Sequence, residues 1–141
     1  MPVTSAAAPL TLLNPAGLYD PAPNGYSHVA IVAPGARVVH VAGQGGETAD
    51  GALPPTFAAQ LRQAMDNLHT ALQAAGAAPK DVAKLTVLIV DHDERKLHAL
   101  GAELDRLWGP ATKPACTLIP VPRLALDGML FEVDAVAVLP V

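Results

Sequence analysis

The chain ends with PACTLIPV at residues 114–121 and MLFEVDAVAV at residues 129–138, two strand-like runs on either side of a turn. The second run carries two carboxylates, Glu132 and Asp134, within apolar sequence. Since successive side chains of a strand point to opposite faces, both acids share one face. The other face collects Phe131, Val133, Ala135 and Ala137. An acid in an apolar strand is costly to bury unless it has a function, so Glu132 is the first candidate for chemistry.

The composition predicts a single folded domain over residues 1–141, with an irregular segment rich in Pro, Ala and Gly at residues 1–25. Apolar residues make up 51% of the chain and charged residues 16%, which argues against disorder. The net charge is -4 and no basic cluster occurs, so we expect no nucleic-acid partner. The chain has a single cysteine and lacks the pattern of a signal peptide, which predicts a cytoplasmic protein. It also lacks an apolar run of about 18 residues, so we expect no membrane partner.

The predicted elements are mostly strands, with two amphipathic helices. Apolar and β-branched runs predict strands at residues 11–14, 27–33, 37–42, 82–90, 116–121 and 130–139. A Pro-Gly turn predicts that the second and third of these form a hairpin. Apolar residues at steps of three and four predict helices over residues 56–75 and 93–108. The helices can cover one sheet face and leave the face with Glu132 open to a partner.

Several motifs together resemble the YjgF/RidA family. They are GYSH at 25–28, VAGQ at 41–44, QxxQAxxNL at 60–68, AG at 75–76, DVxKxTV at 81–87, PA at 114–115 and FEVDAVA at 131–137. The resemblance implies a chorismate-mutase-like α+β fold, with a mixed β-sheet of about six strands and two helices packed on one face. It also implies a homotrimer with clefts between subunits, and hydrolysis of reactive imines and enamines to the ketoacid and ammonia.

The resemblance assigns roles to particular residues of this chain. It implies that Glu132 orients or polarises the attacking water. The residues that it places against a small-molecule ligand are Tyr26, Gly43, Gln44, Cys116 and Thr117. Deaminating members have an arginine at the position of Cys116, and that arginine binds the substrate carboxylate. Because a thiol cannot replace a guanidinium fork, its loss should cost about 1.5–3 kcal/mol of carboxylate binding.

Each candidate also has a purely structural interpretation. Glu132 could be solvated in the central channel of the trimer, and Tyr26 could be an ordinary packing residue. We expect Cys116 to line a pocket rather than act as a nucleophile, because no His or Lys is adjacent in sequence to lower its pKa. For Asn67 we favour a hydrogen bond between helix and sheet. For Arg123 we expect a solvated turn position, and the less favoured alternative is that it reaches across to the pocket of a neighbouring subunit.

Two functions therefore compete. The first is a hydrolase of a small imine, enamine or related carbon–nitrogen substrate, with water activated by Glu132. The second is a non-catalytic trimeric protein that binds a small ligand in the intersubunit clefts. A third, ribonuclease activity, fits poorly with an acidic chain. The five histidines show no metal-ligand spacing with Cys116 or the acids, so we expect no metal and no cofactor.

Overall fold

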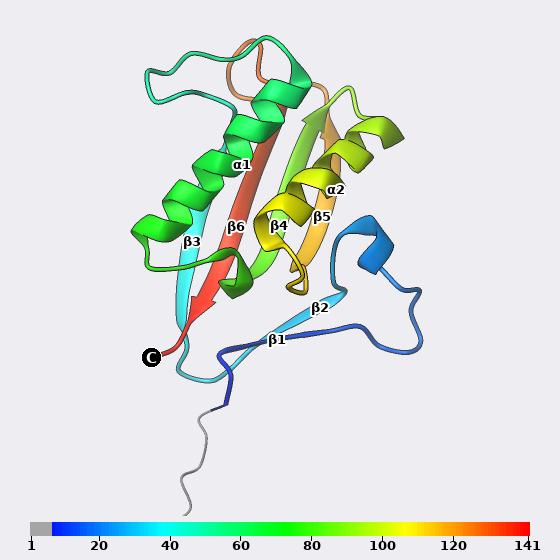
Figure 1. The fold of residues 1–141 in the computed structure, drawn as a ribbon, viewed down its shortest axis with the longest axis vertical. Coiled ribbons are helices and arrows are strands. Elements are labelled where there is room, and N and C mark those ends of the chain that lie inside the picture. Colours follow the sequence, from blue (N-terminus) through cyan, green and yellow to red (C-terminus); the bar gives the residue numbers. More distant parts are fainter. Residues whose placement is uncertain (1–6) are drawn as a thin grey trace, which may run out of the picture.

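The computed structural model describes residues 7–141 of the chain. Two helices lie across one face of a four-stranded sheet, and a two-stranded ribbon lies at one end (Figure 1). The helices are α1 (Phe57–Ala74) and α2 (Glu94–Trp108), with short 3-10 turns η1 (Ala22–Asn24) and η2 (Pro79–Asp81). The strands are β1 (Leu10–Leu13), β2 (Val29–Val32), β3 (Arg37–Gln44), β4 (Val82–Val90), β5 (Ala115–Val121) and β6 (Phe131–Leu139).

The larger sheet has the order β3-β6-β4-β5. Strand β6 is antiparallel to both β3 and β4, whereas β4 and β5 are parallel and α2 connects them. A parallel pair requires such a crossover connection, and a helix is the usual one. The mixed sheet with two helices on one face confirms the predicted α+β fold, although the six strands divide between two sheets.

The predicted hairpin between residues 27–33 and 37–42 is wrong. Strand β2 pairs with β1, with Leu10 opposite Val32, while β3 pairs with β6 in the other sheet. The turn itself is present, and Gly35 adopts a φ of 77° in it. Local turn chemistry sets the chain reversal but does not decide which strand becomes the partner. The predicted irregular segment contains β1, and its residues 1–6 lie outside the described residues.

A side chain caps the start of each helix. The side chain of Thr56 accepts a hydrogen bond from the Ala59 N–H at 3.2 Å, and Asp93 accepts one from Lys96 at 2.9 Å. Gly76, at a φ of 76°, follows the last turn of α1 and reverses the chain. Within residues 7–141, neither helix combines the length and apolarity needed to cross a membrane.

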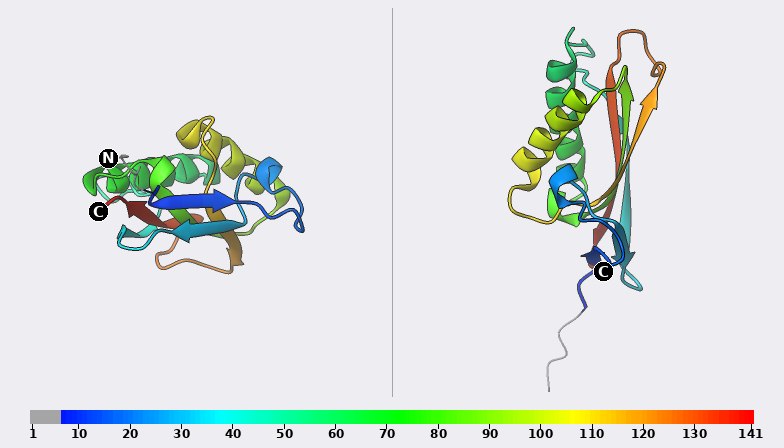
Figure 2. Two further views of the ribbon diagram at one scale, coloured as in Figure 1. Left: turned by 90° about the horizontal axis from the view of Figure 1, so that it is seen from below. Right: turned by 90° about the vertical axis from the view of Figure 1, so that its right-hand side faces the viewer.

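The two faces of the larger sheet differ sharply. Buried side chains of β4 and β6 alternate along the strands and meet the helices, which all lie on one side of the sheet in the right-hand view of Figure 2. We call the other side the open face. From the register, its side chains are those of Val38, His40, Lys84, Thr86, Leu88, Thr117, Ile119, Glu132, Asp134 and Val136. Val38 is 49% exposed and Ile119 43%, so apolar surface remains uncovered.

Candidate functional site

A short segment joins the edge strand β5 and brings Tyr26 to it. Gly25 ends η1 with a φ of 80°, and the following Ser27 forms a parallel bridge with Ala115. The Ser27 N–H donates to the Pro114 carbonyl at 3.0 Å, and its hydroxyl donates to the Lys113 carbonyl at 2.6 Å. Ser27 is 1% exposed, so these bonds fix the segment to the start of β5.

A cavity of about 340 Å³ lies between this segment, α2 and β5. We call it the β5 pocket. Side chains from the three elements line it, chiefly those of Tyr26, Leu97, Leu100, Leu104, Cys116 and Leu118. Figure 1 shows how the blue segment around η1 and the yellow helix α2 lie beside the edge strand. Two of the predicted ligand-contacting residues, Tyr26 and Cys116, therefore meet at one cavity. Thr117 also borders it, but its side chain lies on the open face.

Cys116 faces the helix side of the sheet. Its neighbour across the parallel pair is Leu85, which is fully buried, and Cys116 packs against the same core. Burial raises the pKa of the Cys116 thiol to about 11, although the charge of Lys84 acts in the opposite direction. The thiol is therefore protonated near neutral pH, which suits a lining residue and not a nucleophile.

Tyr26, which lines the pocket, belongs to an aromatic cluster with Tyr19 and His28. The hydroxyls of Tyr19 and Tyr26 share a hydrogen bond, and the ring of His28 meets both tyrosines edge-on, with centroids 5.2 and 5.5 Å away. This hydrogen bond and burial raise the pKa of Tyr26 to about 12. Tyr26 therefore keeps its phenolic proton at physiological pH. Sequence reasoning missed Tyr19, since it lies in a loop and no periodicity links it to Tyr26.

The predicted catalytic residue lies elsewhere, on the open face. The side chain of Glu132 rests on Gly43 of the neighbouring strand: a Cβ on Gly43 would stand 1.8 Å from the Glu132 carboxylate oxygen Oε1. The register shifts between Val41 and Gln44, so Gly43 occupies an irregularity of β3. The absence of a side chain at position 43 is thus what allows the carboxylate to lie there.

The two halves of the predicted site project from opposite faces of the sheet. Glu132 is opposite Leu88 on the open face, whereas Cys116 faces the helices and the β5 pocket. Strand β4 also lies between β6 and β5. Within one chain, the carboxylate and the pocket do not meet.

Several other side chains have structural partners. Lys84 donates to the Thr117 hydroxyl at 2.6 Å on the open face. Arg123 is exposed in the turn after β5 and pairs with Asp127 at 2.9 Å. The amide of Asn67 donates to the carbonyls of Gly45 and Glu47, so it joins α1 to the loop that follows β3 rather than to the sheet itself.

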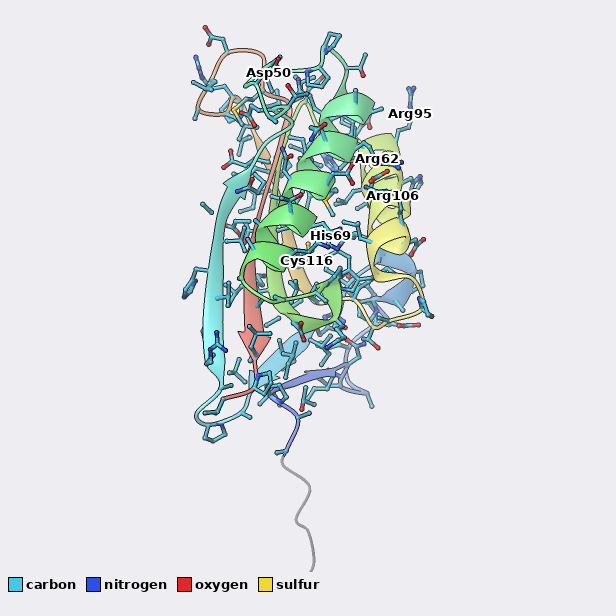
Figure 3. The ribbon with its side chains drawn as sticks, turned by 60° about the vertical axis from the view of Figure 1, so that its left-hand side comes forward. Asp50, Arg62, His69, Arg95, Arg106 and Cys116 are labelled. Carbon is cyan, nitrogen blue, oxygen red and sulfur yellow. The ribbon has the colours of Figure 1, made fainter. Side chains whose placement is uncertain are left out.

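Gln44, another predicted ligand contact, and two arginines of the helices also form local contacts. Gln44 donates to the Ala42 carbonyl at 3.1 Å. Arg62 and Arg106 pair with Asp66 and Glu103 between α1 and α2, and Figure 3 shows them apart from Cys116, which lies on β5. Among residues 7–141, no group of three or more His, Cys, Asp or Glu side chains is arranged to hold a metal ion.

Comparison with known proteins identifies the family. The model of the family described as endoribonuclease L-PSP matches residues 19–139. A Rid family protein of unknown function from Yersinia pestis, YyfB, superposes with a TM-score of 0.88 at 34% identity, covering 94% of this chain and 100% of that one. The chain therefore belongs to this family, the YjgF/Rid family.

Two curated relatives match over shorter stretches. A 2-iminobutanoate/2-iminopropanoate deaminase of Escherichia coli is 34% identical over 88 residues, which is 62% of this chain and 68% of that protein. A RutC family protein of Synechocystis is 38% identical over 81 residues, 57% of this chain and 60% of that protein. The match thus spans just over two thirds of the deaminase but less than two thirds of the RutC family protein.

Proposed function

We propose that this protein is a single-domain, cytoplasmic Rid-type hydrolase that removes ammonia from a small imine or enamine. In the proposed homotrimer, the open face of one subunit brings Glu132 to the β5 pocket of its neighbour. The observation that carries the proposal is the separation of these two parts onto opposite faces of one chain. A site that is split in this way becomes complete only when a second subunit supplies the missing half.

The open face supports the assembly. It exposes Val38 and Ile119, with Val136 and Leu88 between them in the sheet order. Apolar surface of this kind on a flat sheet favours burial against another protein surface. A threefold ring has heterologous contacts, so each subunit can give its open face to one neighbour.

The proposed reaction uses water and needs no other reactant. Glu132 accepts a proton from water while the water oxygen adds to the imine carbon, and returns that proton to the nitrogen, which gives a carbinolamine. Glu132 then transfers the hydroxyl proton of the carbinolamine to the nitrogen, and cleavage of the carbon–nitrogen bond releases ammonia and leaves a carbonyl compound. A positioned carboxylate typically contributes about 10²–10⁴-fold to such proton transfers.

The relatives favour a hydrolase, whereas Cys116, at which this chain differs from the deaminating members, favours a binding protein. A deaminase among the curated relatives supports hydrolysis. Cys116, in place of the carboxylate-binding arginine, favours the alternative of a trimeric protein that only binds a small ligand. The family label of endoribonuclease finds little support in a chain with a net charge of -4.

The decisive experiment measures ammonia release from imines made in situ. An amino-acid oxidase supplies 2-iminobutanoate, and a flavin amine oxidase supplies benzaldimine from benzylamine. We expect the protein to accelerate ammonia release from at least one imine above the spontaneous rate, and Glu132→Gln to abolish the acceleration. If no imine is accelerated while small ligands still bind, the binding protein is the correct function.

A further inference from the structure

We propose that the β5 pocket receives the apolar group of a neutral substrate, a phenyl or branched alkyl group beside an uncharged carbon–nitrogen bond, and disfavours substrates that carry a carboxylate. This substrate class rests on the proposed function where turnover is concerned. The binding preference itself can be measured without turnover.

The wall of the pocket is hydrocarbon. Leu97, Leu100 and Leu104 recur at steps of three and four along α2 and so present one face of the helix to the cavity. Leu100 and Leu104 are each 2% exposed and are held in the core. Leu118 of β5 closes the opposite side. A ligand that enters this space loses water from an apolar surface, which favours an apolar ligand group.

The β5 pocket offers no positive charge to the carboxylate of a ligand. Among the described residues that line the pocket, none carries a charged side chain. Lys84 bonds to the Thr117 hydroxyl on the open face, and Lys113 is paired with Asp105 at 2.7 Å. The thiol of Cys116 is protonated near neutral pH. An ionised carboxylate placed here would lose hydration without gaining a cation.

The size of the cavity fits a small ring with a few further atoms. An apolar cavity of about 150 Å³ can hold benzene, and ligand pockets start at about 300 Å³. The β5 pocket, at about 340 Å³, lies at the lower end of that range. Among the residues that line it, Asn24 and Tyr26 carry polar side chains, which suit a hydrogen bond to a neutral nitrogen or carbonyl.

The test compares two probes of nearly equal shape, phenylacetamide and phenylacetate, by calorimetric titration at pH 7.5. We expect the amide to bind at least about 10-fold more tightly than the acid. We expect Cys116→Arg to reverse the order, because the guanidinium supplies the missing cation. Equal binding of the two probes by the wild-type protein, or tighter binding of the acid, would overturn the proposal.

A matched pair of leucine variants locates the binding. Leu97→Trp fills the pocket and should weaken phenylacetamide binding at least about 10-fold. Leu107→Trp places the same side chain on the same helix outside the pocket lining, and affinity should stay within about threefold. Wild-type affinity in folded Leu97→Trp would show that the probe binds elsewhere and would also overturn the proposal.

The Glu132→Gln protein separates this proposal from the hydrolase function. The variant should still bind phenylacetamide, because the leucine wall of the pocket is unchanged. Selective amide binding without hydrolysis of any imine would support the pocket and contradict the enzyme. Hydrolysis of 2-iminobutanoate with no preference for the amide would support the enzyme and contradict the pocket.

Discussion

The β5 pocket and the Gly43–Glu132 pair achieve their shape in different ways. The pocket is enclosed by three segments that are distant in the sequence, and its walls are side chains that can vary in size. The pair is set within a hydrogen-bonded sheet, where a missing Cβ leaves room for one carboxylate. Ligand choice can therefore change by substitution in α2 and β5, whereas the position of the carboxylate depends on the absence of a side chain at Gly43.

The largest expected effect is on the carboxylate. Glu132→Gln keeps the shape of the side chain but removes the base, so hydrolysis should fall about 10²–10⁴-fold. Affinity for a ligand of the pocket and the thermal midpoint should change little. The measurement is the rate of ammonia release, with the probe titration as its control. A variant that turns over substrate at the wild-type rate would remove Glu132 from the mechanism.

Two glycine variants test the close approach. Gly43→Ala should displace the Glu132 carboxylate, a flexible group, and lower the rate by about 10²-fold with little loss of stability. In Gly46→Ala the new Cβ meets backbone atoms of Gln60, at 2.6 Å for Cα, and the protein should lose about 1–3 kcal/mol of unfolding free energy.

Rate assays and urea unfolding of both glycine variants distinguish these effects. If Gly43→Ala lowers stability as much as Gly46→Ala does, Gly43 serves the fold and not the carboxylate.

The pocket should respond to a change of charge. Cys116→Arg restores the cation of the deaminating members and should raise kcat/KM for 2-iminobutanoate about 10–100-fold, the effect of a charged hydrogen bond. The matched substitution Cys116→Leu should give no gain, since it adds volume without charge. Strong turnover of 2-iminobutanoate by the wild type would mean that another cation already binds the carboxylate.

The smallest effect concerns stability at high pH. Burial raises the pKa of Cys116 from 9.0 to about 11, so between these values the unfolded chain releases the proton and the folded chain retains it. The unfolded state therefore gains stability as pH rises, and the folded protein should lose about 1–2 kcal/mol by pH 10.5 relative to pH 8. Urea titrations of wild type and Cys116→Ala measure this, and an equal pH dependence of the two would contradict burial of the thiol.

The sequence predicted those features that depend on local pattern. Both helices follow from apolar residues at steps of three and four, and the alternation of β6 places Glu132 on the uncovered face. The pairing of β2 with β1 was not predictable from the Pro-Gly turn, because partner choice depends on distant strands. The face of Cys116 depends on its register with Leu85, which a single strand does not reveal.

Mixed oligomers test most directly whether one site is shared between two subunits. Glu132→Gln keeps the pocket and Leu97→Trp keeps the carboxylate, so each variant alone should be nearly inactive on benzaldimine. The two variants are unfolded together in equal amounts and refolded, so that subunits assemble at random. In a threefold ring, about half of the pockets are then intact, and about half of these have a neighbour with Glu132. About a quarter of the sites are therefore complete. We predict that about this fraction of wild-type activity returns. Activity that remains at the average of the two separate variants, in oligomers shown to be mixed, would contradict a shared site.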